Sequence, residues 1–450
     1  MNILKNYIEK YYVKNNYLKT LVITFLFLSI IFTRSFLGIQ IWMFRLGELV
    51  MAFSALIFLI TLIIFKPIYE EKYKSIFLTS VLVLLTFGMT VVFTGSNLFN
   101  VYTYKASSYI WSIGFLFLGL TLPKLKTLRR PYSILLQISL LIIYLVAIYD
   151  FPENIVEFFY SYSDKYEPHK GSDIVINFAI LIYFLNRFYK HNQYGFELFL
   201  VNLSIFLPLF LYKSRAALIS ILIFVIYELF LYRKEILRFN FRRIIVFLFV
   251  SILLIVSTFL SQRYVVVEFS EETIEQIPDA FKTLGEYKFS KYKDDYPLFY
   301  ISEKRLFSGD GNLNWRLQLW QDAIEDNYQE NKLFYGIGYK SKFNVFIENN
   351  LVNTIGVADG NDRRGLDGLN EHVHNYFLTI FLRGGFLQLL VFFTFYYSLF
   401  QSAKKNNQLF EMIIFSTSVM FVSFFDSSME NAHFPLLFYF FVGNQYLKKS

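Results

Sequence analysis

The sequence contains no cysteine, and only 17% of its 450 residues are charged. The absence of cysteine excludes disulfides, thiolate nucleophiles and cysteine-ligated metal sites. The scarcity of charge excludes an ordinary soluble domain, in which about a quarter of the residues carry charge. Hydrophobic residues make up 55% of the chain and aromatic residues 21%. These proportions indicate an integral membrane protein.

Apolar runs of 16 or more residues recur along the chain. Such runs form helices that satisfy their own backbone hydrogen bonds in lipid, whereas a transmembrane β-barrel shows alternating segments of about ten residues. We therefore predict an all-α polytopic membrane protein with about 12 transmembrane helices, at residues 18–33, 46–65, 75–94, 107–122, 132–151, 172–187, 195–212, 215–232, 243–262, 374–400, 410–425 and 432–447.

The tenth run is interrupted by Arg383-Gly384-Gly385. This interruption predicts either a kinked span or a short external helix that leads into a span, and the sequence leaves both open.

Basic residues fall mainly in every second connection between the apolar runs. With the N-terminus in the cytoplasm, the inner connections carry 22 Lys and Arg residues and the short outer connections carry seven. Because cytoplasmic loops are enriched in these residues, both termini are predicted to be cytoplasmic. Residues 1–19 are polar, and no small-residue cleavage site follows the first apolar run, so we expect a first span rather than a cleaved signal.

The ninth and tenth spans are joined by residues 263–371, far more than a connector needs. Residues 263–372 hold 13 basic and 19 acidic residues, whereas the whole chain has a net charge of +8. The chain thus divides into nine spans within 1–262, a large outer loop at 263–371, and three spans within 372–450.

Part of this loop is predicted to be helical. Leu313, Leu317, Trp320 and Ile324 recur at helical spacing, which predicts an amphipathic helix over residues 313–328. Its acidic residues are expected to face water, namely Asp322, Glu325 and Asp326.

Two arginines on the predicted outer side are candidates for binding phosphate. Arg215 opens the eighth span after a very short connection, and a guanidinium can bind phosphate oxygens bidentately. A snorkelling contact with lipid headgroups also explains this position. Arg316 precedes Trp320 by four residues, so the two share a helix face and can make a cation–π contact. A surface arginine lying over an indole is the alternative.

His374, at the start of the tenth run, is a candidate general base, because an imidazole near neutral pH can take a proton from a hydroxyl. A histidine that caps a helix start is the alternative. His372 lies about 200° away around a helix, and the pair lacks metal-ligand spacing, so no metal site is predicted. Arg383 would face away from His374 on a continuous helix, which predicts a buried pairing or interfacial charge.

Three further ionisable residues, Asp426, Glu430 and His433, lie in the last outer connection. Asp426 and Glu430 are four residues apart and would share a helix face, from which they can orient a base or hold an acceptor. An ordinary polar loop is the alternative.

At these residues the sequence resembles the O-antigen ligase / O-antigen polymerase superfamily of bacterial envelope proteins. Ser214-Arg215-Ala216-Ala217 looks like the family's Ser-Arg-small motif at the outer end of a span. Arg316-x-x-x-Trp320, followed by Gly336-x-Gly338, resembles a run in the family's large periplasmic loop.

The His motif extends the resemblance. His374-Asn375, followed after nine residues by Gly385, is similar to the ligase-type pattern. Gln388 departs from that pattern, which has Gly, Thr or Tyr there, and this departure favours polymerase over ligase.

The resemblance implies a glycosyltransferase C-like fold and an inverting transferase that needs no metal or cofactor. Such an enzyme would act at the periplasmic face of the bacterial inner (cytoplasmic) membrane on an undecaprenyl-diphosphate-linked glycan. The acceptor would be lipid A-core for a ligase, or a growing glycan for an O-antigen or exopolysaccharide polymerase.

The resemblance also implies roles for individual residues. Arg215 and Arg316 would stabilise the charge that develops on the diphosphate, and His374 would take the acceptor's proton. Trp320, Asn375 and His372 would contribute to substrate binding.

A polysaccharide transporter or flippase is the alternative from another class. It would place ionisable residues within spans and show two related halves, and the sequence shows few of the former and no obvious repeat. Nucleic acid is not an expected partner, because the basic residues lie in short connections rather than on one face.

Overall fold

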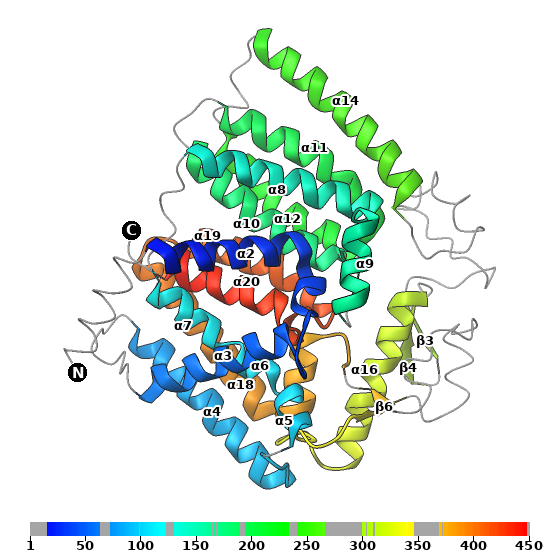
Figure 1. Ribbon diagram of the computed structural model, residues 1–450. Helices are drawn as coiled ribbons and strands as arrows, with labels where there is room; N and C mark the ends of the chain where they lie inside the picture. The colour runs from blue at the N-terminus through cyan, green and yellow to red at the C-terminus, as the bar shows by residue number, and fades with distance from the viewer. Residues whose placement is uncertain are drawn as a thin grey trace.

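The structure is a computed structural model that describes residues 16–63, 73–98, 100–122, 130–163, 166–167, 169–189, 194–233, 241–265, 299–302, 304–308, 311–345, 369–370 and 372–447. Up to residue 265 these form a helical bundle (Figure 1), with helices α2 (Asn16–Leu37), α3 (Leu46–Ile63), α4 (Lys74–Thr94), α5 (Val101–Ala106), α6 (Ser108–Trp111), α7 (Gly114–Thr121), α8 (Arg130–Tyr149), α9 (Glu153–Tyr162), α10 (Gly171–Tyr189), α11 (Gly195–Lys213), α12 (Arg215–Leu231) and α14 (Phe241–Tyr264). A small hairpin of β1 (Gln40–Ile41) and β2 (Phe44–Arg45) joins α2 to α3.

The later part of the chain adds α16 (Gly311–Gln329), α18 (Tyr376–Lys405), α19 (Leu409–Phe421) and α20 (His433–Phe441). Short turns η3 (Val422–Phe424) and η4 (Ser428–Glu430) lie between α19 and α20, and a π-helical turn, η5 (Val442–Tyr446), follows α20. Two antiparallel pairs accompany α16: β3 (Tyr300–Ser302) with β4 (Arg305–Phe307), and β5 (Phe343–Asn344) with β6 (Leu369–Asn370).

Seven described helices are long and apolar enough to cross a membrane: α2 from Thr20, α3, α4, α10, α11, α14 and α18. The number rises to eight if α8 and α9, which meet at 82°, form one broken span. The predicted class, an all-α polytopic membrane protein, is thus confirmed. Helical segments occupy all twelve predicted ranges, but twelve as the number of spans stays a prediction.

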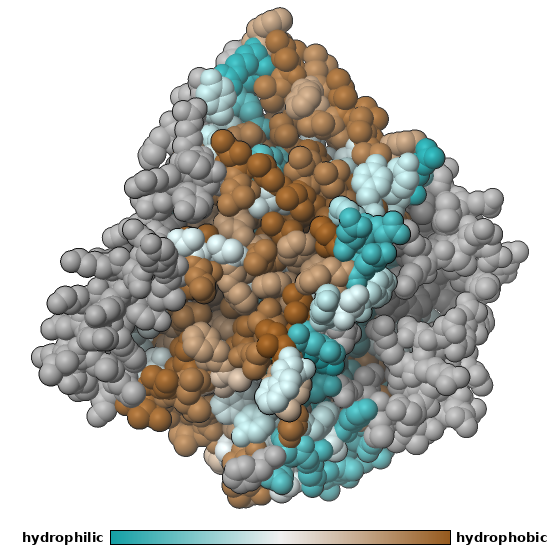
Figure 2. Space-filling view, viewed as in Figure 1, coloured by the Kyte–Doolittle hydropathy of each residue, from teal (hydrophilic) through white to brown (hydrophobic). Residues whose placement is uncertain are grey.

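The helices differ in how much of their surface faces outward. In α10, 78% of the residues in its most apolar stretch are buried, and the mean hydropathy of that stretch is 1.2. In α14 only 11% of the corresponding residues are buried, and the mean hydropathy is 2.8. A helix that faces lipid must be apolar all round, whereas a central helix can pair polar side chains with its neighbours. Asn177 of α10 does so, donating to the carbonyl of Ile30 at 2.9 Å. Figure 2 shows the resulting broad apolar face, bordered by hydrophilic residues on the side of α16.

We call the end of the bundle near α16 the α16 end; the ends of α9 and α14 also point there (Figure 1). The predicted helix at 313–328 is confirmed as α16, and its predicted buried face is confirmed in part, because Leu317 is buried and Trp320 packs against a small core. Ile324 is 39% exposed, while Leu319 and Ala323 are buried in this small core with Val373 and Leu382.

Polar contacts decide which face of α16 is buried. Gln318 is fully buried and donates to the carbonyl of Leu306 in β4 at 2.8 Å, while Asn314 accepts from the Ser308 amide at 3.0 Å. Asp322 was predicted to face water, and this is wrong: it pairs with Arg305 of β4. Glu325 is exposed, as predicted.

The predicted tenth span does not run straight from residue 374. Gly385 interrupts α18 with φ 73° and ψ −178°. The two halves fold back on each other: the hydroxyls of Tyr376 and Tyr396 lie 3.0 Å apart, although 20 residues of straight helix would extend about 30 Å. The first half is therefore a separate short helix joined to the second by a sharp bend. That this short helix lies outside the membrane stays a prediction. His374 lies directly before this short helix.

Backbone contacts hold this bend. A Cβ atom on Gly385 would lie 2.0 Å from the Phe334 carbonyl oxygen, and one on Gly336 would lie 2.2 Å from that of Arg383. Both glycines also have positive φ, so side chains are excluded by strain as well as by space. The Gly336-x-Gly338 segment therefore packs directly on the bend of α18.

Candidate functional site

His374 lies in the short segment that joins the small core to α18. It precedes the helix and has φ 51°, while Asn375 is the N-cap, its side chain accepting from the Leu378 amide at 3.0 Å. Trp320 of α16 donates its indole N–H to the Val373 carbonyl at 2.6 Å. The capping that the sequence allowed for His374 is thus done by Asn375, and the imidazole itself is left available for other chemistry.

The surroundings of His374 keep its imidazole neutral. The pKa of His374 is lowered to about 4. Burial is the largest cause, Arg316 and His372 also lower the pKa, and the carboxylates of Asp426 and Glu430 raise it. The ring of Trp315 stands edge-on to the imidazole, with centroids 5.1 Å apart. At neutral pH this histidine is therefore in the form that can accept a proton.

Arg316 is close enough to His374 to lower its pKa. It lies on α16 one turn before Trp320, and its side chain is partly buried. The structure thus brings together a neutral imidazole and a guanidinium, from segments 58 residues apart in the sequence.

His372 and Glu430 form a second pair beside His374. The Nδ1 atom of His372 contacts Glu430 Oε2, and Glu430 Oε1 accepts from the Thr379 hydroxyl at 2.9 Å. The Glu430 side chain is only 5% exposed. Glu430 therefore ties His372 to the first half of α18, which is the part next to His374.

The four-residue spacing of Asp426 and Glu430 predicted that they share a helix face, and this is wrong. They lie in the turns between α19 and α20, with Glu430 in η4 and Asp426 before it. They approach His374 all the same, because these turns, rather than a helix, carry both carboxylates toward it.

Asp426 belongs to a charged cluster at the α16 end, formed with Arg34, Asp173 and His433. Arg34 lies 3.0 Å from Asp173 and 3.3 Å from Asp426, and His433 lies 3.3 Å from Asp173. Burial raises the pKa of Asp426, but Arg34 and the hydroxyl of Ser172 outweigh burial and hold the pKa below its usual value. Asp426 therefore stays ionised next to His374.

A break in α2 positions Arg34. Thr33 has φ 47° and ψ −126° inside the helix, a conformation that is costly for a β-branched residue. The last turn of α2 leaves the helix axis there, and Arg34 reaches α10 and the turn before α20.

Arg215 is the first residue of α12, after the N-cap Ser214, whose side chain accepts from the Ala217 amide at 3.4 Å. It is exposed and is not among the four charged groups named above around His374. Its turn nevertheless packs on the start of α10, because a Cβ on Gly171 would lie 2.8 Å from that of Ser214. The next residue, Ser172, donates to Asp426 at 2.8 Å, so the turn before Arg215 packs on the segment that contacts the cluster.

Arg383 is a buried pairing charge, as predicted. It is 1% exposed, and it donates to the carbonyls of Gly338 at 3.3 Å and Ser341 at 3.1 Å and to the Tyr102 hydroxyl at 3.1 Å. Its guanidinium also lies 4.4 Å from the ring centre of Phe343. Arg383 thus fastens the loop after α16 to the bend of α18.

Gln388, the departure from the ligase pattern, is buried in a tyrosine network. Its Oε1 accepts from Tyr109 at 2.7 Å and from Tyr339 at 2.8 Å. A Cβ on Gly384 would lie 1.7 Å from this oxygen. Gln388 therefore links α6, the loop after α16 and α18.

In the part of the chain that the structure describes, no group of three or more His, Asp and Glu side chains is arranged to hold a metal ion.

These features define a polytopic helical membrane protein whose candidate site combines a neutral histidine, Arg316 and the ionised carboxylate of Asp426 at one end of the bundle. Residues 200–393 match the family model described as O-antigen ligase. The resemblance seen in the motifs is therefore confirmed for this segment, which indicates a membrane glycosyltransferase of the O-antigen ligase or polymerase type. No curated protein and no solved structure matches the chain.

Sequence reasoning missed two members of the cluster, Arg34 and Asp173. The matched segment contains Arg215, Arg316 and His374 but neither of these, nor Asp426. In the sequence, Arg34 and Asp173 are each an ionisable residue at the end of an apolar run. Residues that simply flank a transmembrane helix have the same pattern, so the sequence does not distinguish them.

Proposed function

We propose that this protein transfers a glycan from a polyprenyl-diphosphate carrier to an acceptor hydroxyl at the periplasmic face of the bacterial inner membrane. The observation that carries the proposal is the placement of neutral His374 beside Arg316, within a segment that matches O-antigen ligase. Cytoplasmic termini and an outer α16 end follow from the distribution of basic residues.

In the proposed reaction His374 accepts the proton of the acceptor hydroxyl while that oxygen attacks the anomeric carbon. The bond from the anomeric carbon to the diphosphate oxygen breaks, with inversion. Arg316, joined by Arg215, stabilises the negative charge on the departing diphosphate. Asp426 and Glu430 favour the imidazolium that forms, because both carboxylates raise the pKa of His374.

The remaining predicted contacts are proposed to hold the site together or to bind the glycan. Trp320 fixes the His374 segment through Val373, and Asn375 fixes the start of α18. His372 faces Glu430 and is partly exposed, so it can reach a sugar hydroxyl.

The proposal is tested by His374→Ala, Arg316→Ala and Arg215→Ala, with Lys332→Ala as a surface-charge control in the same loop. We expect the His374 variant to lose about 10²–10⁴-fold in transfer rate, as loss of a general base implies, and the arginine variants to lose comparable activity. The measurement is transfer from purified polyprenyl-diphosphate glycan by correctly inserted protein. Wild-type rates for His374→Ala would remove it as the base, and inhibition by EDTA would contradict a metal-independent reaction.

Repeat-unit polymerase is the second candidate, and it is favoured by Gln388 at the position where the ligase pattern has Gly, Thr or Tyr. A deletion strain analysed on a lipopolysaccharide gel separates the two. Loss of the whole ladder, with long lipid-linked polymer accumulating, indicates a ligase. Core carrying a single repeat indicates a polymerase.

A further inference from the structure

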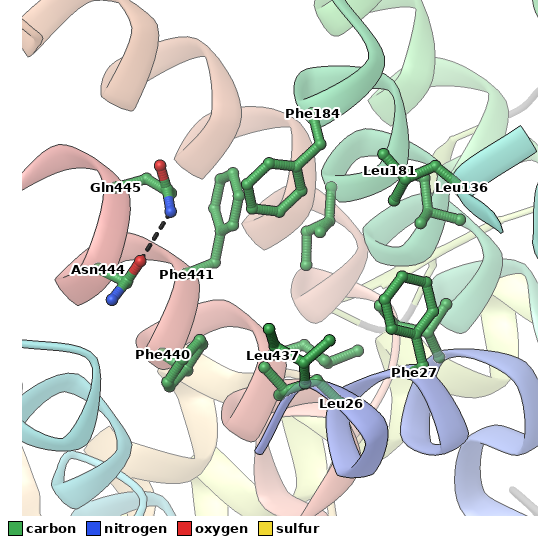
Figure 3. Close-up of a pocket in the computed structure, with 13 residues that line it drawn as sticks. Leu26, Phe27, Leu136, Leu181, Phe184, Leu437, Phe440, Phe441, Asn444 and Gln445 are labelled. Atoms are coloured by element: carbon green, nitrogen blue, oxygen red, sulfur yellow. Dashed lines mark hydrogen bonds between the residues drawn. The ribbon is translucent and has the colours of Figure 1, made fainter. Parts of the chain in front are cut away.

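A small apolar pocket, which we call the cavity, is open on one side and lies among α2, α8, α10, α20 and the turn η5 (Figure 3). Its walls are almost entirely hydrocarbon, with side chains such as Leu26, Leu136, Phe184, Leu437 and Phe441 pointing into it. An apolar cavity offers water no hydrogen bonds and is filled favourably by hydrocarbon. Since the helices around it belong to a membrane bundle, the expected occupant is the apolar chain of a lipid.

Two polar residues line one side of the cavity, but their amides bind protein groups. Asn444 donates to the carbonyls of Gly119 and Leu122 at 3.0 and 3.3 Å, and its oxygen accepts from Gln445 at 2.7 Å. The two hydrogen bonds to carbonyls hold η5, which follows α20, against the end of α7. The amides therefore do not require a polar ligand in the cavity.

The cavity lies directly below the charged cluster, because three of its four helices also carry that cluster. On α2, Arg34 comes four residues after Ile30, and on α20, His433 comes four residues before Leu437. Asp173 stands on α10, seven residues before the part that lines the cavity. These separations correspond to about one to two helical turns of 5.4 Å. The interface between α2, α10 and α20, which we call the seam, thus runs from the charged cluster to the apolar cavity.

We propose that this cavity holds part of the isoprenoid chain of the lipid-linked donor, an inference that rests on the proposed function. Arg34 contacts Asp426, and Asp426 acts on His374, so the charged end of this interface lies next to the candidate catalytic groups. A donor whose diphosphate lies between the arginines and His374 places its chain down this seam. The seam matches the donor's chemistry, with charge at one end and hydrocarbon below it.

The test fills the cavity and measures binding without requiring transfer. Leu26→Trp places an indole in the cavity, whereas Leu21→Trp on the same helix changes a side chain that is 64% exposed. The probe is an isoprenyl diphosphate with a photoreactive group on its chain, bound to the purified full-length protein in nanodiscs. We expect Leu26→Trp to weaken binding at least about tenfold, as the loss of about two buried methylenes implies, and Leu21→Trp to leave it unchanged.

Leu437→Phe adds less volume to the cavity than Leu26→Trp. If Leu26→Trp does not fold, the probe affinity of Leu437→Phe is the deciding measurement. Unchanged affinity in a folded cavity variant overturns the proposal. Equal competition by phosphatidylglycerol also overturns it, because the cavity would then bind any lipid chain.

The binding assay separates this inference from the proposed function. Cavity-dependent binding of the probe without any glycan transfer would count against the proposed function and support the cavity assignment. If the protein transfers glycan but binds the probe equally well with and without the cavity substitutions, only the cavity assignment is overturned.

Discussion

His374 shows how the surroundings of one residue set its chemistry. It is mostly buried, with Arg316 and His372 lowering its pKa and Asp426 and Glu430 raising it. Burial outweighs the carboxylates, so the imidazole stays neutral through the physiological range. When it accepts a proton, the same carboxylates stabilise the product.

The pH dependence of activity follows from this environment. The pKa of folded His374 is about 4, so we expect kcat/KM to stay level on lowering the pH to about 5 and to fall only below that value. Arg316→Gln removes a charge that lowers this pKa, so the acid limb of its residual activity should move to higher pH. The measurement is a pH–rate profile, and an acid limb near pH 6.5 in the unaltered protein would contradict the assignment.

Stability has a related pH dependence. An unfolded histidine titrates near pH 6.5, above the folded value for His374, so protons bind first to the unfolded state as pH falls. His374 therefore makes the fold lose stability as the pH drops from about 6.5 to about 4.

At the scale of elements, the bend in α18 determines where the site lies. A straight helix would carry His374 away from the second half of α18, whereas the bend at Gly385 brings Tyr376 back to Tyr396. The loop after α16 packs on this bend, and Arg383 fastens it there. Helix α16, with Arg316, is thus held over the start of α18.

Gly385→Ala should damage both stability and activity. The added Cβ would meet the Phe334 carbonyl oxygen at 2.0 Å, at a residue with φ +73°, and the strained backbone alone costs about 1–3 kcal/mol. Gly88→Ala in α4 is the matched control, because a Cβ there meets nothing within 4 Å. Thermal unfolding in detergent should show a lower midpoint for Gly385→Ala and an equal or higher midpoint for Gly88→Ala. Equal midpoints for both variants would show that the bend tolerates a side chain.

At the scale of the whole molecule, the charged cluster joins the first and last parts of the chain. Arg34 comes from α2, Asp173 from α10, and Asp426 from the turn before α20. Each charge is compensated by a partner from a distant segment, which makes burial of the charges tolerable.

Arg34→Met should therefore destabilise the bundle. It leaves the Asp173 carboxylate, 1% exposed, and Asp426 without their cation, which costs about 3–5 kcal/mol for a buried pair. The control is Arg45→Met, because Arg45 pairs with Glu48 at 3.9 Å on the surface and such a pair contributes about 0–1 kcal/mol. The readout is the thermal midpoint of both variants, and similar midpoints would contradict a structural role for the cluster.

Membrane orientation is the last prediction at this scale. A reporter inserted near Asn312 should lie outside the cytoplasm, and a reporter after the C-terminus should lie inside, as the distribution of basic residues implies. Accessibility of each reporter in intact cells checks both. A cytoplasmic signal near Asn312 would place the α16 end on the wrong side for a periplasmic donor.

The sequence by itself determined the class of the protein, the positions of its long apolar helices and of α16, and the motif residues Arg316 and His374. These follow from local pattern, because long apolar runs and helical spacing depend on neighbouring residues. The polar part of the buried surface of α16 was missed, because Gln318 and Asn314 become core residues only once β4 and the residue after it supply their hydrogen-bond partners.

Only the tertiary structure decided that α18 bends back, that Asp426 and Glu430 reach His374 from turns, and that Arg34 belongs to the same end. Contacts of this kind join residues up to 392 positions apart, as in the hydrogen bond from Arg34 to Asp426. The free energy of such a contact depends on burial and on a distant partner, and neither is encoded in the residue's own neighbourhood.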